Sequence, residues 1–431
     1  MQKTKLSSKF WVALTIFSLI GQVAWVVENM YFNVFIYKMF RASAADISMM
    51  VGASAAAATI TTLLIGALSD KIGKRKLFIC SGYILWGISI FSFSMIRVDV
   101  IESIFPMTVS AASVGVSLVI IMDCVMTFFG SAANDACFNA WVTDTTDETN
   151  RGAAEGINSM MPLVAILVVF GGFMSFNLDL ESSWVTIFRI IGCVVLVLGI
   201  LGFFLIQDHP IDTLENQSYF GNIFYGFRPS VMKENKMFYI ILATFAIFNI
   251  SIQTYMPYLI LYYNVSLKLD NYVLIMAPAV IVAAVVTAFY GKVYDKFHFK
   301  FAIVPSIGML MLGYILLYTF TNTALVFVGS LFMMSGYLTG MAVCGAMIRD
   351  CTPENKTGMF QGLRIFGQVL VPGIIGPAIG AKVLQNAEQI LNDDGTFSFI
   401  PNKNIFLAAL VVAFGLSIVL RHVFRMLKGD K

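Results

Sequence analysis

Twelve long apolar segments run through this chain of 431 residues. An α-helix needs about 20 mostly apolar residues to cross the roughly 30 Å hydrocarbon core of a bilayer. Because the segments are long and continuous, rather than short and alternating, they predict helices and not a closed barrel. The sequence thus predicts an all-α membrane protein in contact with the lipid bilayer. The predicted spans are residues 10–37, 44–68, 77–96, 110–140, 156–176, 185–206, 237–262, 272–290, 301–320, 324–348, 359–385 and 405–424.

The composition supports this fold class and excludes several others. Hydrophobic residues make up 58% of the chain and charged residues 12%, whereas soluble domains have about 45–50% and 25%. The net charge of only +3 gives no positive footprint for nucleic acid, so we expect no nucleic-acid partner. The three histidines and six cysteines form no cluster. We therefore expect no metal site, no disulfide framework and no cofactor.

The charges in the loops predict the orientation of the chain. Lys3, Lys5 and Lys9 precede the first apolar run, which is too long for a signal peptide and lacks a cleavage-like end. Most of the 28 lysine and arginine residues lie at the termini or in loops that an even number of spans places on the same side as the termini. The positive-inside rule then predicts cytoplasmic termini and a multi-pass protein of the cell membrane, inner or plasma. We expect it to act as a monomer.

Two halves of six spans are separated by the longest polar interruption between spans. We predict an N-terminal bundle (1–206), a central cytoplasmic loop (207–236) and a C-terminal bundle (237–431). The outer loop 386–404, with Asp394-Gly395 and Pro401, is predicted to be a solvated turn.

Two loop sequences recur in corresponding places of the halves. Residues 66–76, GALSDKIGKRK, follow the second span, and 291–296, GKVYDK, follow the eighth. Residues 144–156 follow the fourth span and 350–362 follow the tenth, with matching acidic, threonine and glycine positions. Repeated halves of this kind are typical of carriers that work by alternating access.

On these motifs the chain resembles the major facilitator superfamily, whose G-x-x-x-D-[RK]-x-G-[RK]-[RK]-[RK] loop is matched by residues 66–76. Residues 350–362 look like the D…E-x-K-T-G-x-x-[EQ]-G stretch of glycoside-pentoside-hexuronide:cation symporters. Residues 24–29 are similar to the acid-bearing first helix of proton-coupled sucrose carriers. The resemblance implies two pseudo-symmetric six-helix bundles, with spans one, four, seven and ten lining a cavity. The chain departs from sodium-coupled melibiose-type carriers, since 48–68 holds no acid, which favours H+ over Na+.

Glu28 in the first span is the first candidate for chemistry, because an ionisable residue within a span is costly unless it is paired, hydrated or neutralised. Helical spacing places Gln22, Trp25, Asn29 and Asn33 on one polar face with Glu28 on its flank. We predict that Glu28 binds the coupling proton. The alternative is a neutral Glu28 that locks helix packing through a hydrogen bond. Gln22, Trp25 and Asn29 are candidate substrate contacts, and Trp25 is either a stacking platform for a sugar ring or a packing residue.

A second polar stripe descends the fourth span. Asp123 is followed by Thr127, Ser131 and Asn134 at helical spacing. If Asp123 and Glu28 both face the cavity, one binds substrate hydroxyls and the other the proton, or the two share a proton as coupled acids. Asp123 is therefore a candidate for both roles and Thr127 for substrate binding. The alternative for Asp123 is an ion pair with Arg189.

The seventh span supplies candidate substrate contacts from the second half. Asn249 and Gln253 form an i, i+4 pair suited to sugar hydroxyls, with Tyr258 nearby. The alternative is that these amides join helices to one another. Gly376 and Gly380 are expected to allow close helix packing.

The repeated loops predict a gate at the cytoplasmic face. Asp70 is expected beside the start of the eleventh span and Asp295 beside the start of the fifth, where helix N-termini attract negative charge. Arg364 is either a charge partner of this gate or, with Gln361 and Gln368, part of a stripe that reaches the cavity. The alternative for the positive residues is that they only fix the topology. The predicted gating residues are Gly66, Asp70, Gly73, Arg75, Asp144, Arg151, Asp295, Asp350, Lys356 and Arg364.

These features predict a secondary active transporter that couples proton symport to a sugar or glycoside. The alternative is a proton-coupled antiporter of the same fold for drug or metabolite efflux, in which Glu28, Trp25 and Tyr31 would bind lipophilic cations. An enzyme is not expected, because the chain has no nucleotide-binding G-x-x-x-x-G-K-[ST] loop and its three histidines sit in or near loops.

Overall fold

A computed structural model describes residues 6–105, 110–147, 150–208, 225–352, 363–392 and 395–429. Within these ranges twelve helices are long and apolar enough to cross a membrane, as predicted. The largest differences at the start of a span are in the fifth and ninth, which begin at Arg151 and Lys296, five residues before the predicted starts. Hydropathy marks only the apolar core of a span, whereas the backbone hydrogen bonds of the helix continue into its polar first turn.

The described chain forms two compact units. Unit 1 comprises Met1–Ala42 and Ala53–Gly221, and unit 2 comprises Ser43–Gly52 and Asn222–Lys431. The division at 221/222 falls inside the predicted loop 207–236, of which 209–224 lie outside the described residues. Residues Ser43–Gly52, at the start of the second span, belong to unit 2. The sequence did not predict this assignment.

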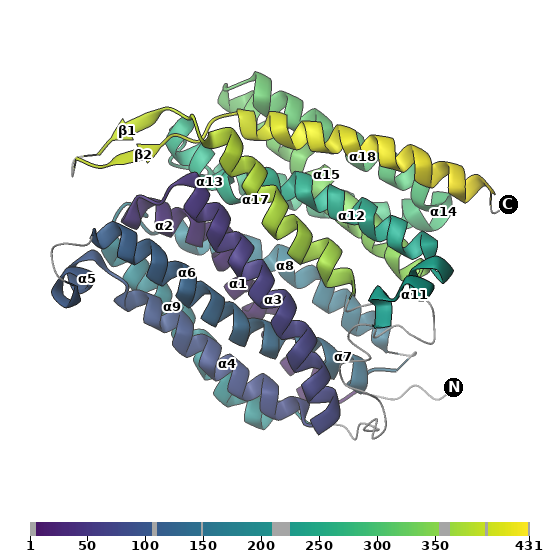
Figure 1. The fold of residues 1–431 in the computed structure, drawn as a ribbon. Helices are drawn as coiled ribbons and strands as arrows, with labels where there is room; N and C mark the ends of the chain where they lie inside the picture. Colours follow the sequence, from purple (N-terminus) through teal and green to yellow (C-terminus); the bar gives the residue numbers. More distant parts are fainter. Residues whose placement is uncertain are drawn as a thin grey trace. The chain divides into compact units, whose positions relative to one another are not determined.

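All regular secondary structure in the described part of unit 1 is helical. Its helices α4 and α9 run side by side (Figure 1), and α1 packs against α8. Its elements are α1 (Ser8–Val26), η1 (Val27–Tyr31), α2 (Phe32–Phe40), α3 (Ala44–Ile72, shared with unit 2), α4 (Arg75–Ser92), η2 (Phe93–Met95), α5 (Val98–Ile104), α6 (Ala111–Gly130), η3 (Ser131–Phe138), α7 (Asn139–Thr145), α8 (Arg151–Phe173) and α9 (Glu181–Leu205).

Unit 2 packs α12 against α17 and α18, and α14 against α15. Helix α14 turns at His298, where φ is 61°, so it contains the eighth and ninth spans. Its elements are η4 (Tyr225–Phe227), α11 (Pro229–Glu234), α12 (Lys236–Tyr255), η5 (Met256–Tyr258), α13 (Leu259–Leu261), η6 (Tyr262–Ser266), α14 (Val273–Thr319), α15 (Thr323–Asp350), η8 (Phe366–Leu370), α17 (Val371–Leu384), β1 (Gln389–Leu391), β2 (Phe397–Phe399) and α18 (Asn404–Gly429).

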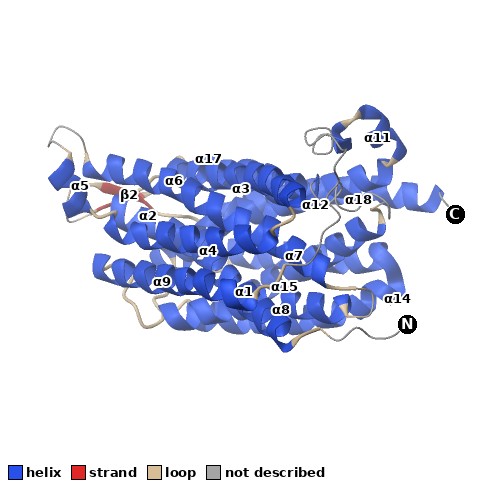
Figure 2. Ribbon diagram, turned by 90° about the horizontal axis from the view of Figure 1, so that it is seen from below, coloured by secondary structure: helices blue, strands red, loops and turns tan. Residues whose placement is uncertain are grey.

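The loop between the last two spans contains a β-hairpin that the sequence did not predict, and part of β2 is buried, so the predicted solvated turn was wrong for this part of the loop. Strands β1 and β2 pair antiparallel, with Leu391 opposite Phe397, and β2 is the red element in Figure 2 among the blue helices. Phe399 is buried and packs edge-on against Tyr258. This apolar contact fixes one end of the hairpin to unit 2, whereas a solvated turn would have no such anchor.

The outer faces of the helices are apolar, as contact with lipid requires. Along α9 the exposed side chains recur at helical spacing and include Phe204, which is 71% exposed. The opposite face of α9 carries glycines that let other helices approach closely. A Cβ at Gly192 would lie 2.6 Å from the backbone nitrogen of Phe91 on α4. The exposed stripe of α9 is Ile190, Val194, Val197, Leu201 and Phe204.

Candidate functional site

A π-helical segment interrupts the first span at the position of Glu28. Segment η1 covers Val27–Tyr31 and lies between α1 and α2. A π turn disturbs the regular i to i−4 ladder, and such segments occur frequently at functional sites. Two residues of the predicted polar face form hydrogen bonds to the backbone here. Asn29 Nδ2 donates to Trp25 O at 2.8 Å, and Asn33 Nδ2 donates to Asn29 O at 3.0 Å. The amides thus satisfy carbonyls beside the irregular turn.

The Glu28 carboxyl is buried among hydroxyl groups of unit 1. Its side chain is only 7% exposed. Ser54 Oγ from α3 lies 2.7 Å from Glu28 Oε1, and Thr127 Oγ1 from α6 lies 2.9 Å from the same oxygen. The two hydroxyl oxygens are 2.8 Å apart. The hydroxyl of Thr127, a predicted substrate contact, is therefore occupied by Glu28 and Ser54.

Asp123 lies next to this group. It is 2% exposed, and its nearest interactions are with the Glu28 carboxyl and the Ser54 hydroxyl. Among the described residues, no salt bridge joins it to Arg189. Glu28 Oε2 and Asp123 Oδ1 are both buried without a hydrogen-bond partner in the part of the chain that the structure describes. The predicted pair of acids therefore comes together, with two free oxygens.

Asp135 is an acid of the same region that the sequence analysis missed. It lies in the π-helical segment η3 and is only partly buried. Ser131 Oγ donates to Asp135 Oδ2 at 3.0 Å, and Asn134 Nδ2 approaches Oδ1 at 3.4 Å. Asp123, Thr127, Ser131 and Asp135 form a continuous i, i+4 series, so the helical spacing contained the signal that would have found Asp135.

Aromatic rings surround the acids. The Trp25 indole lies next to Asp135, and its ring centroid is 5.0 Å from that of Trp86 on α4. Tyr83 Oη donates to Asn134 Oδ1 at 2.9 Å or Phe17 O at 3.1 Å. Trp25 remains half-exposed, Gln22 is half-buried and Asn29 is exposed. The predicted polar face of the first span therefore retains accessible surface beside Asp135.

Glycines allow this close arrangement. A Cβ at Gly21 would lie 2.7 Å from Asn134 Oδ1 and 2.8 Å from Tyr83 Oη. A Cβ at Gly130 would lie 2.7 Å from the Trp86 ring. Any larger residue at these two positions would displace the polar network or the indoles.

The predicted contacts of the seventh span lie in unit 2 and do not form one group. Asn249 is buried and its Nδ2 donates to Phe245 O of its own helix at 2.9 Å. Gln253 is half-buried beside Gly376, where α12 and α17 approach closely as predicted. Tyr258 is fully buried, and its hydroxyl lies 2.9 Å from Ala44 O and 3.1 Å from Pro377 O. This placement favours a packing role for Tyr258.

Three of the predicted gating residues meet at one end of unit 1. The buried Arg75 guanidinium binds Asp70, and its Nε lies 3.0 Å from Asp144 Oδ2. This cluster joins the end of α3, the start of α4 and α7. Gly73 forms the turn between α3 and α4 with φ at 71°, a conformation that favours glycine. The surroundings of Gly66 do not require a glycine, because a Cβ added there would lie 3.8 Å from Ala136 Cβ, an ordinary van der Waals contact.

The other predicted gating residues that the structure describes do not join the Arg75 cluster but form separate local contacts. Arg151 binds Thr146 O at 3.1 Å within its own loop, and Arg364 Nε donates to Gln368 Oε1 at 3.0 Å. Asp350 accepts a hydrogen bond from Tyr294 at 2.5 Å, and burial together with this bond raises the pKa of Tyr294. Burial, and secondarily the charge of Asp350, raises the pKa of the Cys351 thiol to about 11. Lys356 and the side chain of Asp295 lie outside the described residues.

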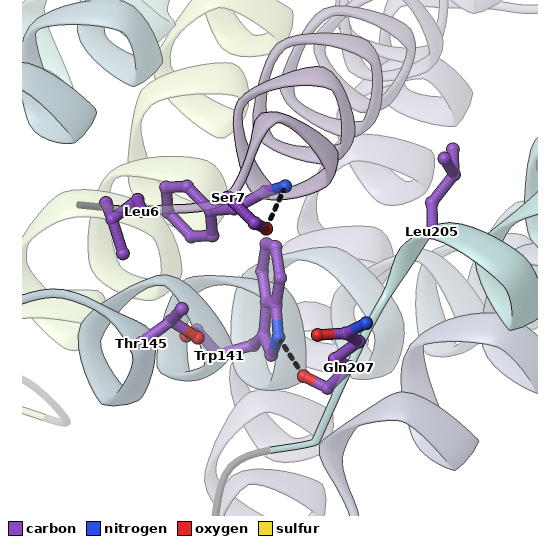
Figure 3. A pocket seen from close by; sticks show the side chains of 7 residues that line it. Leu6, Ser7, Trp141, Thr145, Leu205 and Gln207 are labelled. Atoms are coloured by element: carbon purple, nitrogen blue, oxygen red, sulfur yellow. Dashed lines mark hydrogen bonds between the residues drawn. The ribbon is translucent and has the colours of Figure 1, made fainter.

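A separate pocket of about 170 Å³ lies at the start of α1 in unit 1 (Figure 3). Trp141 lies between α1 and the segment after α9, and its Nε1 donates to Gln207 O at 2.9 Å. None of the described residues that line this pocket is an acid or a base, so it is not part of the Glu28 group. They are Leu6, Ser7, Phe10, Trp141, Thr145, Leu205 and Gln207.

Comparisons with known proteins show the family and the fold of the chain. The sequence model described as Major Facilitator Superfamily matches residues 11–377. No curated protein sequence matches the chain significantly.

Solved structures show the same fold. A mutant form of the nucleoside transporter NupG has a TM-score of 0.71 at 14% identity, covering 95% of this chain and 99% of its own. A bacterial homologue of the human lysosomal transporter Spinster, inward-facing and unoccupied, has a TM-score of 0.69 at 15% identity, covering 97% of each chain. The E. coli xylose transporter XylE, partially occluded and inward open, has a TM-score of 0.69 at 14% identity, covering 96% of this chain and 98% of its own. At such identities the likeness establishes the fold alone.

Proposed function

This chain belongs to the major facilitator superfamily, and we propose that it carries a sugar or glycoside by proton symport. It is a multi-pass membrane transporter of that superfamily, a family of transporters rather than enzymes. Two of the structural neighbours are named as transporters of xylose and of nucleosides, and both of these substrates present ring hydroxyls. This supports a hydroxylated substrate.

The observation that carries the proposal is the buried Glu28 carboxyl. Among the described residues its hydrogen-bond partners are the hydroxyls of Ser54 and Thr127, and no lysine or arginine binds it. A carboxylate within a span is costly without a counter-charge, and a bound proton removes that cost. We assign Glu28 and Asp123 to the proton, with Thr127 as a hydrogen-bond partner of Glu28. H+ is favoured over Na+ because residues 48–68 of the second span hold no further acid.

The substrate side of the proposal uses the half-exposed residues. Asp135 offers a carboxylate already oriented by Ser131, and Trp25 offers an indole face beside it. A carboxylate accepts hydrogen bonds from sugar hydroxyls, and an indole packs on the apolar face of a ring. Gln22, Asn29, Asn249 and Gln253 remain proposed contacts.

The gate and orientation complete the proposal. We place both termini in the cytoplasm and treat 1–206 and 237–431 as the two rocking bundles of a monomer. The Arg75 cluster then lies on the cytoplasmic face, where its ion pairs break and re-form during the transport cycle. Asp295, Lys356 and Arg364 are proposed to act on the same face.

The test is proton movement in proteoliposomes. Mono- and disaccharides are added in turn to vesicles that hold the protein, while the pH of the outer medium is recorded. Symport predicts alkalinisation with one sugar, and Glu28→Gln should abolish the alkalinisation while sugar binding persists. Glu102→Gln is a matched control, because Glu102 is exposed in α5 outside the spans. If only lipophilic cations move protons, in the opposite sense, the antiporter alternative replaces the proposal.

A further inference from the structure

Three oxygen atoms in unit 1 lie within hydrogen-bonding distance of one another. Glu28 Oε1 and Ser54 Oγ are 2.7 Å apart, Ser54 Oγ and Thr127 Oγ1 are 2.8 Å apart, and Thr127 Oγ1 and Glu28 Oε1 are 2.9 Å apart. Each oxygen comes from a different span, since Glu28 is in η1, Ser54 in α3 and Thr127 in α6. We call these three groups the oxygen triangle.

The number of protons in the triangle decides its state. Three mutual hydrogen bonds need three protons, whereas each hydroxyl supplies only one. If Glu28 were ionised, only the two hydroxyl protons would be present for three contacts, so one of the contacts would place two lone pairs against each other. A proton on Oε1 completes the ring, because each oxygen then donates once and accepts once.

We infer that Ser54 is a positioning residue of the proton site: Glu28 is protonated on Oε1 in this conformation, and Ser54 and Thr127 close the ring around that proton. This inference rests on the proposed function for its role in transport, but the protonation itself can be measured without transport. It adds Ser54 to the site and removes the hydroxyl of Thr127 from the substrate contacts.

The neighbouring groups explain how the proton would be released. Asp123 and Cys124 of α6 and Asp135 of η3 are the titratable groups that interact electrostatically with Glu28. None of them is cationic, and Glu28 Oε2 and Asp123 Oδ1 are free to accept within the part of the chain that the structure describes. Loss of the proton leaves two hydroxyl protons for the three contacts, so one contact must lengthen, and a shift of α3 or a rotation of Ser54, which also interacts with Asp123, would allow this.

Helix α3 connects the oxygen triangle to the Arg75 cluster at the end of unit 1. Ser54 and Asp70 both lie in α3, and 16 residues of α-helix extend about 24 Å. Asp70 is bound to Arg75 in the cluster described above. A shift of α3 on proton release is therefore transmitted directly to the gating cluster without an intervening loop.

Infrared titration of the protein in liposomes tests the inference. The carboxylic C=O band that disappears in Glu28→Gln reports protonation of Glu28, with or without substrate. We expect this band in the wild type near neutral pH. Ser54→Ala removes two ring bonds from the protonated form but only one donated bond from the ionised form, so the pH midpoint of the band should differ from that of the wild type.

Conservative variants separate positioning from packing. Ser54→Thr retains the hydroxyl and should restore the wild-type midpoint. Thr127→Val, which conserves shape, should also change the midpoint, and Thr127→Ser should restore it. If Ser54→Ala does not fold, Thr127→Val and Thr127→Ser still test the inference.

Two results would overturn the inference: no Glu28-dependent C=O band in the wild type at neutral pH, or equal midpoints in the wild type and the variants that lack a hydroxyl. If the band and its shifts are present but no sugar moves protons, the ring stands and the proposed symport fails. If sugar-driven alkalinisation occurs and Ser54→Ala leaves the band midpoint unchanged, symport stands and the ring fails.

Discussion

Arg75 Nε lies 3.0 Å from Asp144 Oδ2, which ties the start of α4 to α7 at one end of unit 1. Arg75 is 5% exposed, whereas the side chains of Asp144 and Asp70 are 26% and 59% exposed. Water therefore screens the two carboxylates. We expect these ion pairs to contribute free energy of folding near the lower end of the range for charged hydrogen bonds.

Arg75→Gln should lower the stability of the protein in detergent by about 1–2 kcal/mol, because the charged hydrogen bonds to the partly exposed Asp70 and Asp144 are lost. Thermal unfolding followed by fluorescence measures the effect. Lys71→Gln is the control, since Lys71 is exposed in the same segment. A double exchange, Arg75→Asp with Asp144→Arg, should recover part of the loss. Equal melting temperatures for Arg75→Gln and Lys71→Gln would contradict the structural role.

If the proposed substrate contact is right, Asp135→Asn should weaken sugar binding about tenfold, the effect of losing one charged hydrogen bond. Substrate counterflow without a proton gradient measures the half-saturating concentration. Glu155→Gln, an exposed acid at the start of α8, should leave it unchanged. If Asp135→Asn instead abolishes proton movement at unchanged affinity, Asp135 belongs with Glu28 and Asp123 rather than with the substrate.

Gly130→Ala should destabilise unit 1 by about 1–3 kcal/mol, because its Cβ would collide with the Trp86 and Trp25 rings. Transport should fall with it, since the indole beside Asp135 is displaced. The control is Gly171→Ala in α8, where an added Cβ meets nothing within 4 Å and alanine favours the helix. Melting temperatures of the two variants give the comparison, and an unchanged Gly130→Ala protein would rule out the described packing.

Cys351 should react slowly with a thiol reagent at pH 8. Burial and Asp350 raise the pKa of its thiol to about 11, and only the thiolate is the nucleophile. A raised pKa means that the thiolate fraction, and hence the alkylation rate, grows about tenfold per pH unit from about pH 8 to 10 without a plateau. The measurement uses a protein with the other five cysteines replaced by alanine. Asp350→Asn should make the reaction faster, and a plateau below pH 9 in the parent would refute the prediction.

Hydropathy was sufficient to predict the spans, because the bilayer imposes a length and an apolar surface on every spanning helix. The stripe from Asp123 through Asn134 and the acid Glu28 were also visible as polar residues that a lipid environment makes costly. The division into two bundles remains a prediction in its boundaries, since most of the central loop lies outside the described residues.

One feature needed the structure outright, and two others left only a partial signal in the sequence. Ser54 is one of several small polar residues in the second span, and only tertiary packing brings its hydroxyl to Glu28. Asp135 could have been found from its i, i+4 relation to Ser131, but its half-exposed position could not. The hairpin also left a signal, since Asp394-Gly395 between short apolar runs is typical of a β-turn.

The π-helical segments affect how this chain is aligned with others. A π turn holds an extra residue relative to an α turn, so deleting one residue between Val27 and Tyr31 would restore a regular helix and rotate the preceding part of the span by about 100°. A gap-free alignment with a homologue that lacks this insertion would pair Glu28 with a residue on a different face. At identities near 14%, homologous acids in the first span should therefore be matched by superposing coordinates.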